Sequence, residues 1–327
     1  MSKKFLVVLL AVVLMVCSFG SAMAADALKV ALVLPSTIND YAFSQSMYEA
    51  LKTIQGEYGE DKFEIAYSES LGDPTAAEEA IRDYADSGYN IVIAHGSQYG
   101  TKIQAIAPDY PDTIFAWGNG TDTYGLKNVY AYNAEAQQGG YVFGFVASKL
   151  SKSGIVGACG PVESGDAKSY IDGFVNGAIA AGLKADNVRK TYTGSFGDVS
   201  LMNAAAKTHI DEGADVLTGT SQAVPGAISA VQAAGKQWLG VQYDTIPLGP
   251  DVVVASLVYD WTPMLKKILD AREKGVLGGE ALALNFNDNG FVIKWNDAIK
   301  TDQSIKDAVD AMVADIVAGK IDPLAAK

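Results

Sequence analysis

The stretch "ADVLTGTSQAVPGAISAVQAAGKQWLGVQYD" (residues 214–244) contains one complete strand–helix–strand unit. Residues 215–218 and 238–243 are short apolar runs, which are typical of buried strands. Residues 224–234 between them have the length and composition of a helix. A unit of this kind joins two parallel strands of one sheet, so the stretch predicts an α/β fold.

The same alternation runs along most of the chain. Further strands are predicted at residues 29–34, 63–67, 90–94, 113–117, 129–133, 154–158, 188–193 and 252–258, and further helices at residues 40–54, 74–87, 102–107, 136–150, 167–181, 199–211, 262–273 and 304–318. The order restarts near residue 134, which predicts two doubly wound lobes with parallel sheets. We expect the first lobe to comprise residues 25–133 and 255–283, and the second to comprise residues 134–254 and 284–327.

Residues 281–286 and 291–295 flank Asp288-Asn289-Gly290, a strong turn signal, and predict a β-hairpin. The segment "NFNDNG" within it also resembles the start of a calcium loop. Asn296 stands where such a loop needs a bidentate glutamate, so the turn is the better interpretation.

Residues 1–24 have the three parts of a secretory signal peptide: two lysines, a short apolar segment at 5–16, and small residues at Ala22-Met23-Ala24. The apolar segment is too short for a membrane-spanning helix. We therefore expect cleavage after Ala24 and export to the periplasm. Lipoprotein processing at Cys17 is the alternative, which the residues before Cys17 disfavour.

Composition and missing motifs narrow the function classes. The exported chain keeps one cysteine, Cys159, for which we expect a buried, inert thiol and no internal disulfide. The formal charge of −13 argues against nucleic acid and anionic lipid as partners. With two histidines, and without a P-loop or a nucleophile elbow, we expect no catalytic residue, no metal and no cofactor.

In open parallel sheets the ligand crevice lies beyond the carboxyl ends of the strands. The corners that follow the predicted strands carry aromatic and hydrogen-bonding side chains, with Phe43, Tyr99, Phe196 and Trp261 prominent. Both lobes contribute such corners. A site between two lobes, with apolar walls and a few polar groups, suits a small planar ligand.

Four segments resemble a known family in the same order along the chain: "NDYAFSQSMYEAL" (39–51), "YNAEAQQGGYVFGFVASKLSKSGIVGACG" (132–160), "YIDGFVNGAIAAG" (170–182) and the stretch 211–244. They are similar to the basic membrane protein family, the purine nucleoside receptor-like substrate-binding proteins of ABC transporters. The resemblance implies a type I periplasmic-binding fold, whose lobes are joined by hinge strands and close on ligand. It also implies a protein that binds a small molecule and delivers it to an ABC permease. We expect a monomer without enzyme activity.

The resemblance assigns a role to the first of these segments. Phe43 matches an aromatic residue that stacks on a purine, Asp40 matches the acid of the family motif and Gln45 its glutamine, while the family's asparagine is Ser44 here. The residues alone leave another interpretation open. Phe43 falls on an apolar helical stripe and fits the core, and Asn39 or Asp40 fits a helix cap.

Further candidates come from both lobes. Phe196 matches the family's opposing aromatic residue, and Asp244 matches its second acid, which can also cap a turn. Ser97, Asn133 and Gln222 are weaker candidates, for which turn or hinge roles fit equally well.

Two departures from the family pattern predict the ligand. The family's first acid is Gln242 here, and the corner that carries a lysine in nucleoside binders reads Tyr259-Asp260-Trp261. Because ribose hydroxyls favour charged or amide partners, we expect a purine base such as adenine rather than a nucleoside. A nucleoside-binding protein, a binding protein for a sugar or another small solute, and a secreted nucleoside-acting α/β hydrolase remain the alternatives.

Overall fold

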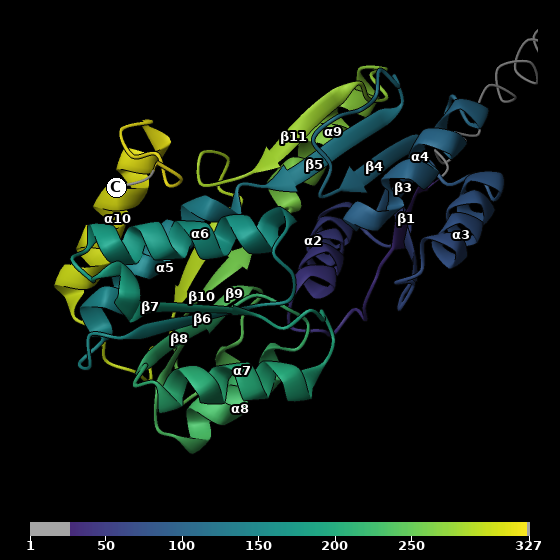
Figure 1. The fold of residues 1–327 in the computed structure, drawn as a ribbon. Helices are drawn as coiled ribbons and strands as arrows, with labels where there is room; N and C mark the ends of the chain where they lie inside the picture. The colour runs from purple at the N-terminus through teal and green to yellow at the C-terminus, as the bar shows by residue number, and fades with distance from the viewer. Residues whose placement is uncertain (1–26, 326–327) are drawn as a thin grey trace, which may run out of the picture.

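The computed structural model describes residues 27–325 as two lobes that lie side by side, each built on a six-stranded sheet (Figure 1). The predicted signal peptide, its cleavage site and Cys17 lie outside the described residues. Within residues 27–325, no helix combines the length and the apolar character needed to cross a membrane.

The first sheet has the strand order β11-β5-β4-β3-β1-β2, and all neighbouring strands are parallel. Its strands are β1 (Leu28–Val33), β2 (Phe63–Ser68), β3 (Ile91–Ala94), β4 (Ile114–Gly118), β5 (Val129–Ala134) and β11 (Glu280–Leu284). Helices α2 (Phe43–Tyr58) and α9 (Thr262–Glu273) cover one face, and α3 (Pro74–Asp86) and α4 (Gly100–Ile106) cover the other.

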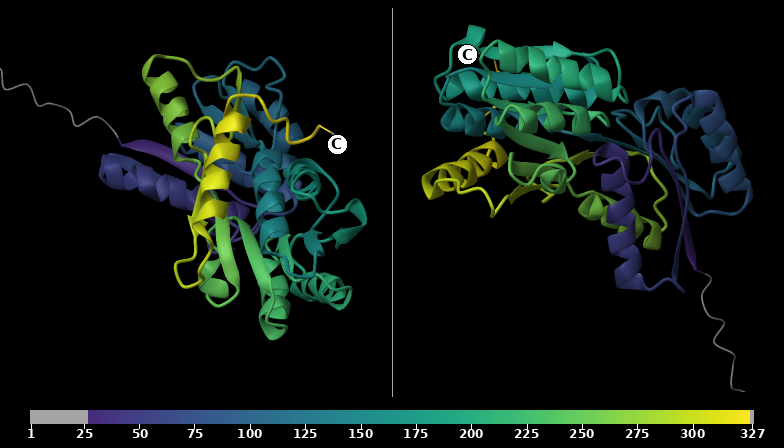
Figure 2. Two further views of the ribbon diagram at one scale, coloured as in Figure 1. Left: turned by 90° about the vertical axis from the view of Figure 1, so that its left-hand side faces the viewer. Right: turned by 90° about the horizontal axis from the view of Figure 1, so that it is seen from below.

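The second sheet repeats this arrangement with the order β12-β10-β9-β8-β6-β7. Its strands are β6 (Val156–Gly160), β7 (Val188–Tyr192), β8 (Val216–Gly219), β9 (Gln237–Gln242), β10 (Val253–Tyr259) and β12 (Phe291–Trp295), of which β12 runs antiparallel to β10. Helices α5 (Ala136–Leu150), α6 (Gly165–Ala180) and α10 (Gln303–Val317) cover one face, and α7 (Val199–Asp211) and α8 (Val224–Ala233) the other. Helix α10 lies at the end of the second lobe far from α3 (Figure 2).

The strands of both sheets are buried on two faces, which explains why they read as continuous apolar runs. In β1, Val30 and Leu32 pack with α2, whereas Ala31 and Val33 pack with α3 and α4. Cys159 is likewise fully buried, as expected, and burial raises the pKa of its thiol to about 12.

The predicted hairpin is wrong. Strand β11 pairs in parallel with β5 of the first sheet, whereas β12 pairs with β10 of the second. The turn itself is present, and Asn289 has a φ of 56°. The turn residues report only the local change of direction, because the two strands find their partners in different sheets.

The chain passes between the lobes at three places that lie together. The first follows β5, the second follows β10 and the third follows β11. Glu135 N donates to Leu284 O at 2.9 Å, and Asp260 N donates to Gly290 O at 2.8 Å, so the three connections are hydrogen-bonded to one another. The expected return at residue 255 falls inside β10, which belongs wholly to the second sheet, so the crossing comes after Tyr259.

Helices α5 and α6 approach closely because each presents glycines to the other. A Cβ on Gly144 of α5 would lie 2.0 Å from Phe174 O, and one on Gly177 of α6 would lie 1.9 Å from Tyr141 O. Neither backbone oxygen can move aside without shifting its helix. The glycines therefore set the spacing of these two helices.

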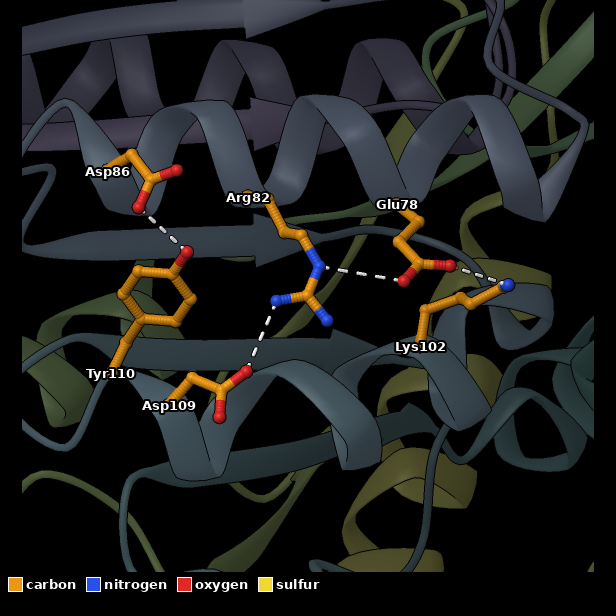
Figure 3. Close-up of polar contacts among 6 residues, drawn as sticks. All are labelled: Glu78, Arg82, Asp86, Lys102, Asp109 and Tyr110. Carbon is orange, nitrogen blue, oxygen red and sulfur yellow. Dashed lines mark hydrogen bonds and ion pairs between the residues drawn. The ribbon is translucent and has the colours of Figure 1, made fainter.

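A polar network on the surface joins α3 to α4 and the 3-10 segment η2 (Ala107–Asp109) (Figure 3). Its members are Glu78, Arg82, Asp86, Lys102, Asp109 and Tyr110. Arg82 lies between two carboxylates, at 3.5 Å from Glu78 and 3.2 Å from Asp109. Exposed pairs of this kind contribute little to stability, so the burial of Ile81 and Ile103 accounts for most of the packing here.

The contact between α5 and α6 gives a prediction about stability. We expect Gly177→Ala to lower the free energy of unfolding by at least about 2 kcal/mol, because the new methyl group collides with Tyr141 O. Gly56→Ala is the matched control, since an added Cβ in the exposed part of α2 meets no atom within 4 Å. It should be neutral or stabilising by up to about 1 kcal/mol. Urea denaturation measures both, and equal effects would contradict the close helix contact.

Candidate functional site

A cavity of about 450 Å³ lies between the two lobes. From the first lobe it is lined by Ser36, Phe43, Ser97 and Asn119, among others, and from the second by Asp166, Phe196, Ser221, Gln222 and Gln242. These residues follow or end β1, β3 and β4 in one sheet and β6, β7, β8 and β9 in the other, apart from Phe43, which begins α2. The cavity therefore occupies the position expected for a ligand in parallel sheets, beyond the carboxyl ends of the strands.

Phe43 forms part of the cavity wall, and its ring packs against His95 and Trp261. Its ring stacks on that of His95, with centroids 3.7 Å apart and planes at 8°. Trp261 meets Phe43 edge-on at 5.9 Å, and its Nε1 donates to Ser46 Oγ at 2.9 Å. Phe43 is 5% exposed, so it belongs to the core and to the cavity wall at once. Trp261 is fully buried and lies behind this wall, outside the lining.

His95 is a buried neutral imidazole whose tautomer follows from its two partners. Its Nε2 lies 2.9 Å from Phe43 O, and because a carbonyl oxygen only accepts, Nε2 carries the proton. Its Nδ1 then accepts from the Tyr132 hydroxyl at 2.7 Å. Burial lowers the pKa of His95 to about 3, which keeps the ring neutral at physiological pH.

Phe196 supplies an aromatic residue from the second lobe. It is 52% exposed in the loop between β7 and α7, and it lines the same cavity as Phe43. The Ser221 hydroxyl donates to Phe196 O and accepts from Ala223 N at 2.9 Å. Ser221 thereby ties the Phe196 loop to the corner that follows β8.

Asp166 is the charged residue of the cavity lining. It lies in the first turn of α6, and burial raises the pKa of its carboxyl. Asn119 Nδ2 donates to its Oδ1 and Gln242 Nε2 donates to its Oδ2, both at 3.3 Å. Since Asn119 follows β4 in the first lobe, this group spans the cleft. The sequence alone assigned no role to Asp166 or Asn119, although both lie in corners between a predicted strand and the next predicted element.

Asp40 acts as a local cap. Its carboxylate accepts from the backbone N–H groups of Ala42, Ser44 and Gln45 at 2.9, 3.2 and 3.0 Å, and burial raises its pKa. Helix α2 accordingly begins at Phe43 and not at residue 40. Gln45 Oε1 accepts from Tyr41 N at 2.8 Å, and neither Asp40 nor Gln45 lines the cavity.

Of the remaining candidates, some line the cavity and others do not. Ser97 and Gln222 line the cavity, whereas Asn39, Tyr99, Asn133 and Asp244 do not. The Tyr99 hydroxyl donates to Leu71 O at 2.7 Å within the first lobe. Asp244 accepts from Ile246 N at 3.0 Å and forms an ion pair with Lys294. The structure thus brings four of the predicted residues together: Phe43, Ser97, Phe196 and Gln222.

The chemistry of this cavity favours binding. It combines two aromatic side chains, several amides and hydroxyls, and one carboxylate, and its histidine neighbour is neutral and engaged on both nitrogens. Among the described residues, no group of three or more His, Cys, Asp or Glu side chains is placed to hold a metal ion.

Comparison with known proteins identifies the family. The sequence model of the Bmp family, described as PnrA-like ABC transporter substrate-binding proteins, matches residues 27–320. The chain belongs to this family. The predicted resemblance and the type I periplasmic-binding fold are thereby confirmed, and the protein is a substrate-binding protein of the ABC transporter class.

Individual relatives carry names for more than one role. A purine-binding protein of Brucella abortus is 27% identical over 93% of this chain and 85% of its own. The transcriptional activator protein Med of Bacillus subtilis is 28% identical over 77% of each chain. The solved structure of an ABC transporter solute-binding protein from Conexibacter woesei is 27% identical, with a TM-score of 0.74 over 90% of this chain and 98% of that one.

The neutral state of His95 gives a prediction about pH. The folded pKa of about 3 lies below the value of about 6.5 for an exposed histidine, so the unfolded chain takes up a proton first as the pH falls. The free energy of unfolding therefore falls as the pH is lowered from about 6.5 to about 3. His95→Phe keeps a flat ring but cannot titrate.

We expect the stability advantage of the wild type over His95→Phe to shrink by about 3 kcal/mol between pH 7 and pH 4, measured by urea denaturation at each pH. All other titrating groups are shared by the two proteins and cancel in the difference. An advantage that stays constant with pH would contradict a neutral, buried His95.

Proposed function

We propose that this substrate-binding protein captures a free purine base between its lobes in the periplasm and delivers it to an ABC permease. The observation that carries the proposal is the pair of aromatic residues, Phe43 and Phe196, which come from opposite lobes and line one cavity. A flat base between them gains roughly 1–3 kcal/mol per stacking contact. Amides and hydroxyls in the same wall supply hydrogen-bonding partners for the edge of the base.

The charges of the lining support a base rather than a nucleotide or an anion. Asp166 is the one charged residue among those that line the cavity, and it is an acid. No lysine or arginine is found in the described lining, where a phosphate or carboxylate ligand would need one. Tyr259 and Trp261, which stand where nucleoside binders carry a lysine, are buried outside the lining.

Binding and release follow from the two-lobe design. A ligand that contacts both lobes stabilises the closed arrangement, because in the open arrangement it can contact only one lobe at a time. The three adjacent connections between the lobes allow such a movement without disturbing either sheet. The permease then distinguishes the closed, loaded protein from the open one.

Mass spectrometry of the small molecules released by acid denaturation of the purified protein tests the proposal. A released purine base supports it. A released nucleoside would keep the purine class and reject the free base, and a sugar or another solute would reject the purine class. Conversion of an added nucleoside into products would favour the hydrolase alternative.

Phe196 offers a clean test of stacking. Because the ring is half-exposed, we expect Phe196→Ala to weaken binding of the released base at least about tenfold while leaving the melting temperature unchanged. Phe43→Ala should also weaken binding, but it removes a ring packed on His95 and Trp261 and so destabilises the fold.

Tyr67→Ala is the matched control for Phe196→Ala, since Tyr67 is a similarly exposed aromatic residue on β2, outside the cavity. Calorimetric titration measures the affinities. Equal affinities for wild type, Phe196→Ala and Tyr67→Ala would remove Phe196 from the site.

A further inference from the structure

The two lobes touch each other through side chains that cross the cleft. Asn119, which follows β4 of the first lobe, donates from Nδ2 to Asp166 Oδ1 of the second lobe at 3.3 Å. Tyr41, which precedes α2 of the first lobe, meets Tyr243 of the second lobe edge-on, with ring centroids 6.2 Å apart. The structure therefore shows the lobes in a closed arrangement.

Asp166 carries a negative charge to this contact without a cation to balance it. Its side chain is only 9% exposed. Burial raises the pKa of its carboxyl, and the groups between residues 27 and 325 that lower it are backbone N–H groups and two amides, with no cation among them. An unpaired charge is costly to bury, so Asp166 depends on these hydrogen bonds.

Gln242 anchors one oxygen of Asp166 within the second lobe. Its Nε2 donates to Asp166 Oδ2 at 3.3 Å. Gln242 is 5% exposed and has a φ of 75°, in the left-handed region that glutamine seldom adopts. Such a conformation persists only where the surroundings fix it. Gln242 is therefore a rigid support, which leaves the other carboxylate oxygen facing Asn119 across the cleft.

The contact between Asp166 and Asn119 can be made and broken. Its length of 3.3 Å exceeds the value of about 2.9 Å that is usual for an N–H···O bond, so the bond is weak. When the lobes separate, water can replace Asn119 as the donor to Asp166. Such an exchange changes the free energy little, because one hydrogen bond takes the place of another.

We propose that Asp166 is a positioning residue for lobe closure, which Gln242 supports and which engages Asn119 as a reversible latch between the lobes. The latch favours the closed arrangement before any contact with a ligand is added. A ligand that fits the closed arrangement binds more tightly when a larger fraction of the protein is already closed. The latch does not depend on which small molecule the protein carries, and so goes beyond the proposed function.

Two single variants test the latch in the ligand-free protein, which is unfolded and refolded to remove bound small molecules. Asn119→Gly removes the donor but keeps the backbone, since glycine accepts the φ of 57° at this position. Asn119→Asp places a second carboxylate opposite Asp166, and like charges repel each other. Small-angle X-ray scattering at about pH 8, where carboxyl groups are ionised, measures the radius of gyration.

We expect the wild type to have the radius of gyration of the closed structure and both variants to have a larger one. For Asn119→Asp the increase should be roughly half an ångström or more, as one lobe moves away from the other. Gln104→Glu is the matched control, because it makes the same change from amide to carboxylate in α4 of the first lobe, outside the cavity. It should keep the wild-type value.

A double variant exchanges the two groups across the cleft. In Asn119→Asp with Asp166→Asn, the oxygen of the new amide accepts from Gln242, and its NH₂ group donates to the new carboxylate. We expect the radius of gyration to return to the wild-type value. A role of Asp166 confined to its own lobe could not be corrected by a change in the other lobe.

Equal radii for the wild type, Asn119→Gly and Asn119→Asp would overturn the latch, as would an open wild type. Opening by Asn119→Asp that the double variant does not reverse would also overturn it, because the added charge alone would then explain the opening. Melting curves show which variants are folded, and if Asn119→Asp is not, Asn119→Gly decides. No ligand takes part, so these results stand apart from the proposed function, which the released small molecule tests.

Discussion

The stacking of Phe43 on the neutral ring of His95 fixes one wall of the cavity, and much of the site depends on it. His95 comes from the end of β3, donates to the carbonyl of Phe43 at the start of α2 and accepts from Tyr132 on β5. One buried imidazole thus joins a helix to two strands of the first sheet. It can do so only while it is neutral, because a charged ring could not accept from the Tyr132 hydroxyl and would be costly to bury. The position of the aromatic wall is therefore a property of the core.

The cavity wall from the second lobe is less tightly packed than the wall around Phe43. Phe196 is half-exposed, and its loop is tied down through Ser221 at the next corner. Asp166 accepts one hydrogen bond from Asn119 of the first lobe and one from Gln242 of the second. One wall is thus set by packing and the other by hydrogen bonds. The glycine-mediated contact holds α5 and α6 close together within the second lobe.

Membership of a family of substrate-binding proteins does not by itself choose the ligand. One relative is named for purine binding and another for transcriptional activation, at nearly the same identity. In this fold the ligand is chosen by side chains at strand ends, which vary without any change to the sheets. We therefore expect the few polar groups around Phe43 and Phe196 to carry the specificity.

The sequence by itself determined the order of elements and the class of fold. Helices at 136–150, 199–211 and 262–273 were predicted with the bounds that the structure has, because turn residues and apolar periodicity act locally. Phe43 and Phe196, which both line the cavity, were singled out from sequence because the family resemblance marks them and both lie in corners that follow a predicted strand. Local signals could not tell that Asp40 only caps a helix, which depends on the direction its carboxylate takes.

Only the tertiary structure decided the pairing of β11 and β12 and the group around Asp166. The two strands flank a genuine turn, yet their hydrogen bonds go to β5 and β10 in different sheets. Asp166 meets partners 47 and 76 residues away in the chain, one of them in the other lobe. Such contacts leave no local pattern, because they arise when two sheets place their strand ends on opposite sides of one cleft.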